Sequence, residues 1–381
     1  RDPEMSRGLG DVYKRQNQTL FPRKLKSMKR IFTTIRKEAG RLAILTVLAG
    51  TIASCDSILD YDEGNCTVEY RIKFKYDYNM KFADAFANEV NTVTLYAFDD
   101  DGNFVYQRTE AGAPLKEKDY SMKVDIEPGD YHLVAWAGLD DKSFAIPLMT
   151  LDKSTIEELT VKTNREAATR ASDGSYIVTG DNHKLSALWH AESTKVALTR
   201  SGGGQSQVIT LSLTKNTNNI RIILQQSGSK AINVDDFEFS ITDDNGWMDY
   251  HNNLLEDDKL KYLPFYHTSG VVEEESSTRA DSEEPVISVA VAQITTARLM
   301  ADKKAILRIT NKETGQAVLA IPLIEYLLLT KSQEHVIDDQ EYLDRQDEYS
   351  MTFFLDENST WMKTTIIING WTIRLNDIDD L

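Results

Sequence analysis

The sequence predicts an all-β protein built from two antiparallel β-sandwiches in series. Many short segments alternate apolar and polar residues and are separated by turn residues, which is typical of sandwich strands. Few windows show the spacing of an amphipathic helix. The 381 residues leave room for two ordinary domains once a leader is set aside.

The N-terminal part predicts an export leader rather than part of the fold. Residues 1–27 have no apolar periodicity, and we interpret them as a non-native or upstream segment. Residues 28–54 begin at a methionine and join a basic stretch to an apolar one, as a lipoprotein signal peptide does. These 54 residues carry twelve basic and four acidic side chains, so the rest of the chain has a net charge of −25. A body this acidic repels nucleic acid, and solubility is its simplest explanation.

The end of the leader predicts lipid attachment. Ile52-Ala53-Ser54-Cys55 has the pattern of a bacterial lipobox, so we expect cleavage between Ser54 and Cys55 and acylation of the Cys55 thiol. A short membrane anchor or an ordinary signal peptide is less favoured, because the apolar stretch is short for a membrane span. Several acyl chains, at ~0.8 kcal/mol per buried methylene, would hold the protein permanently at a membrane.

Residues 55–66 predict an acidic tether after the lipid. Either a surface-export signal or a solvated spacer explains its carboxylates, and Asp56-Ser57-Ile58 fits a short O-glycosylation pattern at Ser57. The chain has only two cysteines, so lipid on Cys55 leaves Cys66 without an intramolecular partner. The fold must therefore be stable without a disulfide.

The segment after the tether predicts a half-buried β-strand. From residue 67 to residue 77 every second residue is apolar and the residues between are mostly charged, so one face enters a core. The apolar positions are Val68, Tyr70, Ile72, Phe74 and Tyr76.

The following residues predict a hairpin and a central strand. Residues 93–98 and 104–106 flank Asp99-Asp-Asp-Gly102, and Asp-Gly tolerates the positive φ of a tight turn. Residues 131–136 are nearly all apolar, which indicates a strand covered on both faces. A helical turn is expected within residues 79–90.

A glycine run at residues 202–204 predicts a flexible joint. We therefore expect the first sandwich at residues 67–203 and the second at residues 204–381. The acidic, serine-rich residues 273–285 are expected to be disordered. Further strands are expected at 176–178, 184–192, 195–198, 208–213, 220–224, 237–241, 286–291, 298, 305–309, 317–321, 349–355 and 364–375, with a helix from residue 324.

Several motifs together resemble the FimB/Mfa family of fimbrial anchor subunits of Bacteroidales. YRIKFKYDYNMKFADAF, VTLYAFDDDGNF, PGDYHLVAWAGL, LSLTKNTNNIRIIL, DDNGWMDYHNNLL, QEYLDRQDEYSMTFFLDEN and INGWTIRLN occur in order between Cys55 and the last residues. The resemblance implies two tandem transthyretin-like β-sandwiches in an outer-membrane lipoprotein at the base of a type V pilus. Such a subunit attaches the fibre to the outer membrane and terminates its polymerisation.

The resemblance also implies strand addition to a fimbrial stalk subunit. Stalk subunits lose their first strand to an arginine-specific protease, whereas an anchor keeps it. Arg71 lies inside the predicted first strand, which favours an anchor because paired strands are poor protease substrates. The candidate strand-exchange residues are Val68, Tyr70, Ile72 and Phe74 in the first strand and Ile366, Ile368, Trp371 and Ile373 near the C-terminus. The C-terminal set is either a donor strand or the last core strand.

The sequence offers no pattern for catalysis, and we expect neither a cofactor nor a metal. Six histidines lack the close spacing of a zinc site, and nucleophile-elbow and phosphate-loop motifs are absent from the sequence. Two alternatives stay open. One is a stalk or tip fimbrillin of the same system, and the other is a surface glycan-binding lipoprotein, which would expose aromatic side chains.

Overall fold

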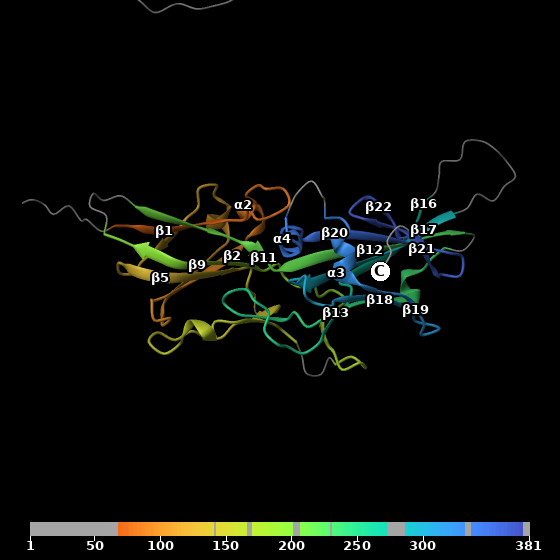
Figure 1. Ribbon diagram of the computed structural model, residues 1–381, viewed down its shortest axis with the longest axis horizontal. Coiled ribbons are helices and arrows are strands. Elements are labelled where there is room, and N and C mark those ends of the chain that lie inside the picture. The colour runs from red at the N-terminus through yellow and green to blue at the C-terminus, as the bar shows by residue number, and fades with distance from the viewer. Residues whose placement is uncertain are drawn as a thin grey trace, which may run out of the picture. The chain divides into compact units, whose positions relative to one another are not determined.

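The computed structural model describes residues 68–140, 142–165, 170–200, 206–228, 231–272, 286–331 and 337–375. Within them the predicted all-β fold of two sandwiches is confirmed (Figure 1). The predictions for Ser54, Cys55, Ser57, Cys66 and residues 273–285 lie outside the described residues. No helix among the described residues is long and apolar enough to cross a membrane.

The first sandwich packs a three-stranded sheet, in the order β10-β1-β4, against a five-stranded sheet, in the order β11-β9-β5-β2-β3. Its strands are β1 (Tyr70–Lys75), β2 (Thr92–Phe98), β3 (Phe104–Ala111), β4 (Met122–Val124), β5 (Gly129–Ala137), β9 (Trp189–Leu198), β10 (Gln207–Ser212) and β11 (Thr214–Lys215).

The second sandwich joins a six-stranded sheet, in the order β16-β17-β12-β20-β21-β22, to a five-stranded sheet, in the order β19-β18-β13-β15-β8. Its strands are β8 (Tyr176–Thr179), β12 (Thr217–Gly228), β13 (Phe237–Asp243), β15 (Leu260–Tyr262), β16 (Tyr266–Val272), β17 (Val286–Ala297), β18 (Ile306–Asn311), β19 (Ala317–Pro322), β20 (Glu348–Leu355), β21 (Trp361–Ile368) and β22 (Trp371–Arg374).

A small sheet and short helices complete the described chain. The small sheet has the order β14-β7-β6. Its strands are β6 (Phe144–Ala145), β7 (Val161–Thr163) and β14 (Trp247–Met248). The α-helices are α2 (Phe86–Glu89), α3 (Leu323–Leu328) and α4 (Asp339–Arg345), and the 3₁₀ helices are η1 (Ala113–Lys116), η2 (Ile156–Glu158) and η3 (Val234–Asp236).

The predicted hairpin and central strand both form. β2 pairs with β3 across the Asp-Gly turn, where Gly102 has φ +80° and the Asp99 carboxylate accepts from the Asn103 amide. β5 lies between β2 and β9. Its apolar composition follows from this position, because Leu133 faces the core of the first sandwich and Trp136 faces residues that continue into the second.

Two details of the predicted topology are wrong. The pairing is not antiparallel throughout, because β1–β10, β12–β20 and β15–β8 run parallel. The domain boundary does not fall near residue 203, because β10 and β11 follow it and pair with β1 and β9 of the first sandwich. The predicted flexible joint at residues 202–204 lies outside the described residues. The strand expected from residue 184 starts at Trp189, and Arg298 follows β17.

The two sandwiches share one continuous apolar cluster. The cluster runs from Tyr96 and Trp136 on the outer face of the first five-stranded sheet, through Leu185 and Leu188, to the core around Ile222 and Phe353. The chain from Asn65 to Leu381 accordingly forms one compact unit. Burial of this apolar surface is the main source of its stability.

One buried carboxyl makes the stability of this core depend on pH. Asp243, at the end of β13, is 4% exposed; its Oδ1 accepts from the Asp244 amide and its Oδ2 has no hydrogen-bond partner. Burial raises the pKa of Asp243 to about 7. The folded protein therefore holds a proton that the unfolded chain releases near pH 4, so stability falls as pH rises between these values.

We expect Asp243→Asn to remove this loss. Between pH 4 and pH 8 the free energy of unfolding of the parent should fall relative to that of the variant by an amount on the order of 4 kcal/mol, because the other titrating groups, such as the buried His190, are common to both proteins. Urea denaturation across this range measures it. Asp100→Asn, in the exposed hairpin turn, is the control and should keep the parental slope. An unchanged slope in Asp243→Asn would contradict the assignment.

Candidate subunit interface

β1 occupies a groove between two other strands of its sheet. It pairs in parallel with β10 from Tyr70↔Gln207 to Lys75↔Ser212, and antiparallel with β4 from Tyr70↔Val124 to Ile72↔Met122. Tyr70, Ile72 and Phe74 are 4%, 1% and 2% exposed, so the alternation seen in the sequence fills the core. Val68 precedes the strand and packs against the same core. The first strand is therefore an interior strand with neighbours on both edges.

An aromatic stack fixes the C-terminal half of β1. The Phe74 ring lies 5.8 Å from that of Phe86 and 6.5 Å from that of Tyr120, with the planes nearly parallel. The Tyr120 hydroxyl donates to Glu110 at 2.6 Å, and burial together with this hydrogen bond raises the pKa of Tyr120. Removing β1 would expose these three rings, which makes its release costly.

Arg71 is held within the paired strand. Its guanidinium forms an ion pair with Glu69 at 2.7 Å and donates to the backbone and side-chain oxygens of Ser121 at 3.2 and 3.1 Å. Its backbone lies between Val208 and Lys123 in the sheet. A protease needs an extended, unpaired segment, so this arginine is protected in the folded protein.

The connection after β1, residues 77–84, is fixed by contacts from the first sandwich and from helix α4 of the second half of the chain. The Asp84 carboxylate accepts from the amides of Tyr76 and Phe86, and the Asn79 amide donates to the carbonyls of Tyr76 and Ala83.

From the second half, the guanidinium of Arg345 at the end of α4 lies 4.0 Å from the ring centroid of Tyr78 and 4.8 Å from that of Phe82. Its carbonyl accepts from the Met80 amide at 3.1 Å. Residues 77–84 contain Lys81 but no arginine. An arginine-specific protease thus finds no site in this connection.

The C-terminal candidate residues divide between two strands. Ile366 and Ile368 belong to β21 and are fully buried. Asn369 and Gly370, with φ of 49° and 84°, form a tight turn into β22. Trp371 is 68% exposed and Ile373 is half-buried, and β22 is an edge strand of the six-stranded sheet. Of the two interpretations of the C-terminal segment, core strand or donor strand, β21 fits the core strand. Of these two strands, only β22 has a free edge.

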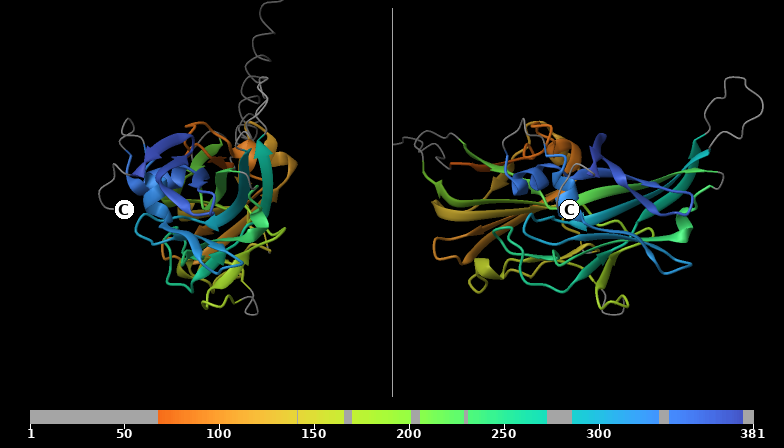
Figure 2. Two further views of the ribbon diagram at one scale, coloured as in Figure 1. Left: turned by 90° about the vertical axis from the view of Figure 1, so that its right-hand side faces the viewer. Right: turned by 45° about the vertical axis from the view of Figure 1, so that its right-hand side comes forward.

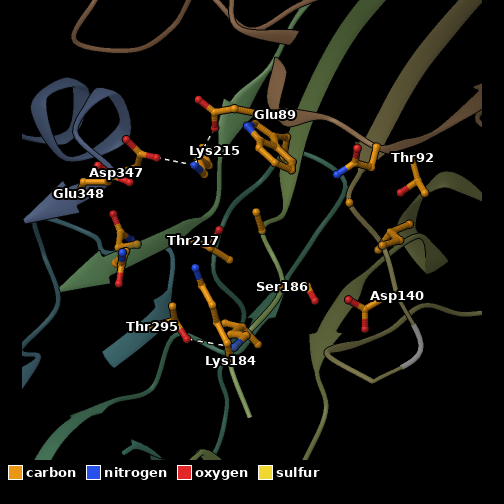
Figure 3. Close-up of a pocket in the computed structure, with 18 residues that line it drawn as sticks. Glu89, Thr92, Asp140, Lys184, Ser186, Lys215, Thr217, Thr295, Asp347 and Glu348 are labelled. Atoms are coloured by element: carbon orange, nitrogen blue, oxygen red, sulfur yellow. Dashed lines mark hydrogen bonds and ion pairs between the residues drawn. The ribbon is translucent and has the colours of Figure 1, made fainter. Parts of the chain in front are cut away.

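The junction of the sandwiches contains a polar cluster that the sequence did not indicate. Figure 3 shows Lys215, at the end of β11, pointing between Glu89 and Asp347; the distance from Nζ to Glu89 Oε2 is 2.9 Å. Burial alone lowers the pKa of Lys215, but the two carboxylates outweigh it and raise the pKa. A cavity of about 520 Å³ lies beside this cluster.

Neighbouring residues extend this contact. Asn216 and Asn252 are buried and exchange side-chain hydrogen bonds at 2.6 and 3.1 Å. Arg298 binds the Asp344 carboxylate through two nitrogens at 2.6 and 2.7 Å and also donates to the Asn252 carbonyl. The Asn216–Asn252 pair crosses the junction, and Arg298 fixes Asn252 from within the second half, so these hydrogen bonds help to hold the two sandwiches together.

Three of the scattered histidines come together at the same junction. His132 of β5 and His251 contact one oxygen of Glu192 at 2.6 and 2.7 Å, and Nε2 of His190 lies 2.8 Å from the Tyr250 carbonyl. Burial would raise the pKa of Glu192, but the hydrogen bonds to the two imidazoles outweigh it and lower the pKa. Among the described residues no group of three such side chains has the arrangement of a metal site.

These observations define a protein of two sandwiches whose first strand is paired on both edges. Residues 62–377 match the family described as fimbrillin-A associated anchor proteins Mfa1 and Mfa2, and the chain belongs to this family. The predicted resemblance is thereby confirmed. The family consists of fimbrial proteins of the cell surface and is not a family of enzymes.

Individual relatives agree with this assignment. Over 363 residues the chain is 22% identical to the minor fimbrium anchoring subunit Mfa2 of Porphyromonas gingivalis, covering 92% of this chain and 99% of the relative. A solved structure of Mfa2 from that organism has a TM-score of 0.59 at 19% identity, covering 80% of this chain and 98% of the other, which shows a common fold.

Two solved structures from Bacteroides thetaiotaomicron are more similar in sequence. One is described as a candidate adhesin and has 35% identity and a TM-score of 0.67, covering 81% of this chain and 97% of the other. The second is described as a candidate polysaccharide-binding protein and has 34% identity and a TM-score of 0.67, covering 82% of this chain and 99% of the other.

We expect Arg345→Ala to loosen the connection after β1. Loss of the stacking on Tyr78 and Phe82 should increase local opening, so that cleavage after the exposed Lys81 by a lysine-specific protease becomes about tenfold faster. Electrophoresis over time and mass spectrometry of the fragments measure this rate.

Glu341→Gln is the matched control, because it removes only the ion pair that the Arg345 guanidinium makes within α4. It should be cut at the parental rate. Equal rates for Arg345→Ala and the parent would show that the stacking does not protect the connection.

Proposed function

We propose that this protein is a lipid-tethered anchor that joins the base of a fimbrial fibre to the outer membrane and ends its polymerisation. Membership of the anchor family supports the fimbrial role. The observation that carries the proposal is the position of β1, which is paired on both edges and supplies three side chains to the core.

The filled groove explains why growth would stop at this subunit. Strand addition requires an open edge that offers unpaired backbone groups and pockets for alternate side chains. β1 already uses the facing edges of β10 and β4 along this groove. With no cleavage site in the connection after β1, the groove stays closed, and no further subunit can insert a strand there.

The tether would fix the closed subunit at the membrane. Acylation of Cys55 and the acidic residues 55–66 place lipid a short distance before β1 in the sequence. Two or three acyl chains hold a protein far more firmly than one. Retention of β1 and retention of the lipid depend on the same event, because a cut after β1 would separate the lipid from the rest of the subunit.

The anchor must still contact the last stalk subunit, and we assign this contact to the C-terminal hairpin. β22 has one free edge. Its Trp371 is the most exposed aromatic side chain among the predicted strand-exchange residues. Release of β22 would leave Ile366 and Ile368 of β21 in the core. The short β22 is therefore the part of the predicted donor segment that can leave the sheet at low cost.

The stalk or tip alternative requires an accessible arginine near β1, and Arg71 is protected. The glycan-binding alternative draws support from the polysaccharide-binding relative. Flat glycan sites usually use exposed aromatic rings. Trp136, Trp189 and Trp361 are buried here and Trp371 is isolated on β22, so the site for a glycan is less well supported than the anchor.

We expect the mature protein to begin at acylated Cys55. Intact-mass spectrometry of protein extracted from fibre-bearing cells should give a chain that starts at this residue, carries lipid and remains uncut at Arg71. Cys55→Ala should release the protein, and fibres with it, into the medium. A mature chain that starts after Arg71 would support the stalk or tip alternative.

We expect removal of residues 371–381 to leave a folded protein that no longer retains fibres. The deletion spares β21, so the denaturation midpoint should fall by less than that of a second variant lacking residues 366–381, which also loses Ile366 and Ile368. Fibre retention on cells is scored by electron microscopy. Normal retention in the shorter deletion would exclude β22 as the docking strand.

A further inference from the structure

β16 is an edge strand without the usual protection against pairing. Its seven residues, Tyr266–Val272, contain no charged side chain other than a histidine and no proline. Among the described strands it is the longest edge strand of this kind. Tyr266 and Val271 are 50% and 51% exposed, and no other described strand carries two exposed large apolar side chains. Edge strands normally carry charges, proline or a bulge that discourage strand addition.

Most other edges of the described sheets are protected or short; β10 is uncharged as well, but it has six residues and a single exposed large apolar side chain, Val208. β3 carries Arg108 and Glu110, β19 ends at Pro322, and β22 has four residues and ends at Arg374. β16 pairs with β17 along one side, and within the described part of the chain no other segment bonds to its outer backbone groups. Figures 1 and 2 show β16 at the margin of its sheet, at the end of the compact unit away from β1.

A pocket of about 170 Å³ opens beside this edge. Its floor includes Val234, Phe237 and Leu263, which are apolar, and the His267 side chain of β16 reaches its rim. On this rim the carboxylates of Asp181 and Asp235 lie 3.8 and 3.3 Å from the His267 ring nitrogens. Both carboxylates are largely exposed and can accept a further cation.

A third carboxylate of this pocket, Glu238, is already paired with Lys261 at 2.7 Å. Lys312, which follows β18, also lines the pocket, and its backbone amide donates to the carbonyl of Asp236. The two carboxylates next to the β16 edge are therefore those of Asp181 and Asp235, which contact His267. A basic side chain on an added strand could place its aliphatic part on the apolar floor and its charge between these carboxylates.

We propose that β16 is a second docking edge, which binds an extended segment of a partner protein that is uncharged except for one basic side chain, which enters this pocket. Main-chain hydrogen bonds to β16 supply the affinity and the pocket supplies the specificity. A second copy of this chain is a poor occupant, because two bodies of net charge −25 repel each other. This site is separate from the C-terminal hairpin and does not depend on it.

The test uses the full-length protein and a synthetic peptide that alternates valine and threonine around one central lysine. Hydrogen exchange should slow at the amides of residues 266–272 when the peptide binds, and calorimetry gives the affinity. Val271→Lys places a charge on the edge strand and should weaken binding about tenfold. Val208→Lys, on β10, is the matched control because Val208 is 53% exposed, and it should bind as the parent does.

The pocket is tested separately. The same peptide with glutamate at its centre should bind more weakly than the lysine peptide, and Asp181→Asn with Asp235→Asn should abolish this preference. If Val271→Lys does not fold, Thr268→Lys provides a second charged edge. Protection at another strand, equal affinity of both edge-charged variants and the parent, or absence of binding would overturn the proposal. None of these outcomes bears on the proposed anchor function, which is tested separately by the Cys55→Ala variant and by the deletion of residues 371–381.

Discussion

The pairing of β1 with both β10 and β4 is the constraint on which the rest of the molecule depends. β10 follows the long chain of the first sandwich and joins β1 in parallel, so the first and last long strands of this sandwich are neighbours. Tyr70, Ile72 and Phe74 then close the core against the five-stranded sheet. Without β1, β10 and β4 would lose their shared partner and the core would be open to water.

The second sandwich stabilises this closed state from outside. Arg345 stacks on the connection after β1, and Lys215 links Glu89 of α2 to Asp347 before β20. The Lys215 side chain is largely buried between its two carboxylates, so breaking these ion pairs leaves a charge in a poorly solvated place, which is more costly than the loss of a surface pair.

Much of the local structure could be predicted from the sequence, because it depends on neighbouring residues. The alternation from Val68 to Tyr76 predicted β1, the Asp-Gly pair predicted the β2–β3 turn, and the apolar composition of residues 131–136 predicted a central strand. The parallel partner of β1 could not be predicted in this way, since a strand pattern gives one buried face but not the identity of the neighbour.

The same limit applies to the junction. Lys215 binds partners 126 and 132 residues away, and the histidines on Glu192 come from strands and loops with no common spacing. The domain boundary expected near residue 203 was wrong, because a glycine run in the sequence does not show which strands pair on either side of it. The glycine-rich composition predicted a joint, but it could not show which strands lie on either side of that joint.

The difference between an anchor and a stalk subunit can therefore rest on a few residues in one connection. The groove that holds β1 is built as an acceptor would be, with two flanking strands and a row of apolar pockets. In the proposed anchor, β1 would stay in this groove because residues 77–84 contain no arginine, Arg71 is paired within the sheet and Arg345 stacks on the connection. An arginine placed in that connection, together with loss of the Arg345 contact, would expose a cleavable segment. Termination of a fibre would then be a property of protease access, and the sandwich itself would need no other change.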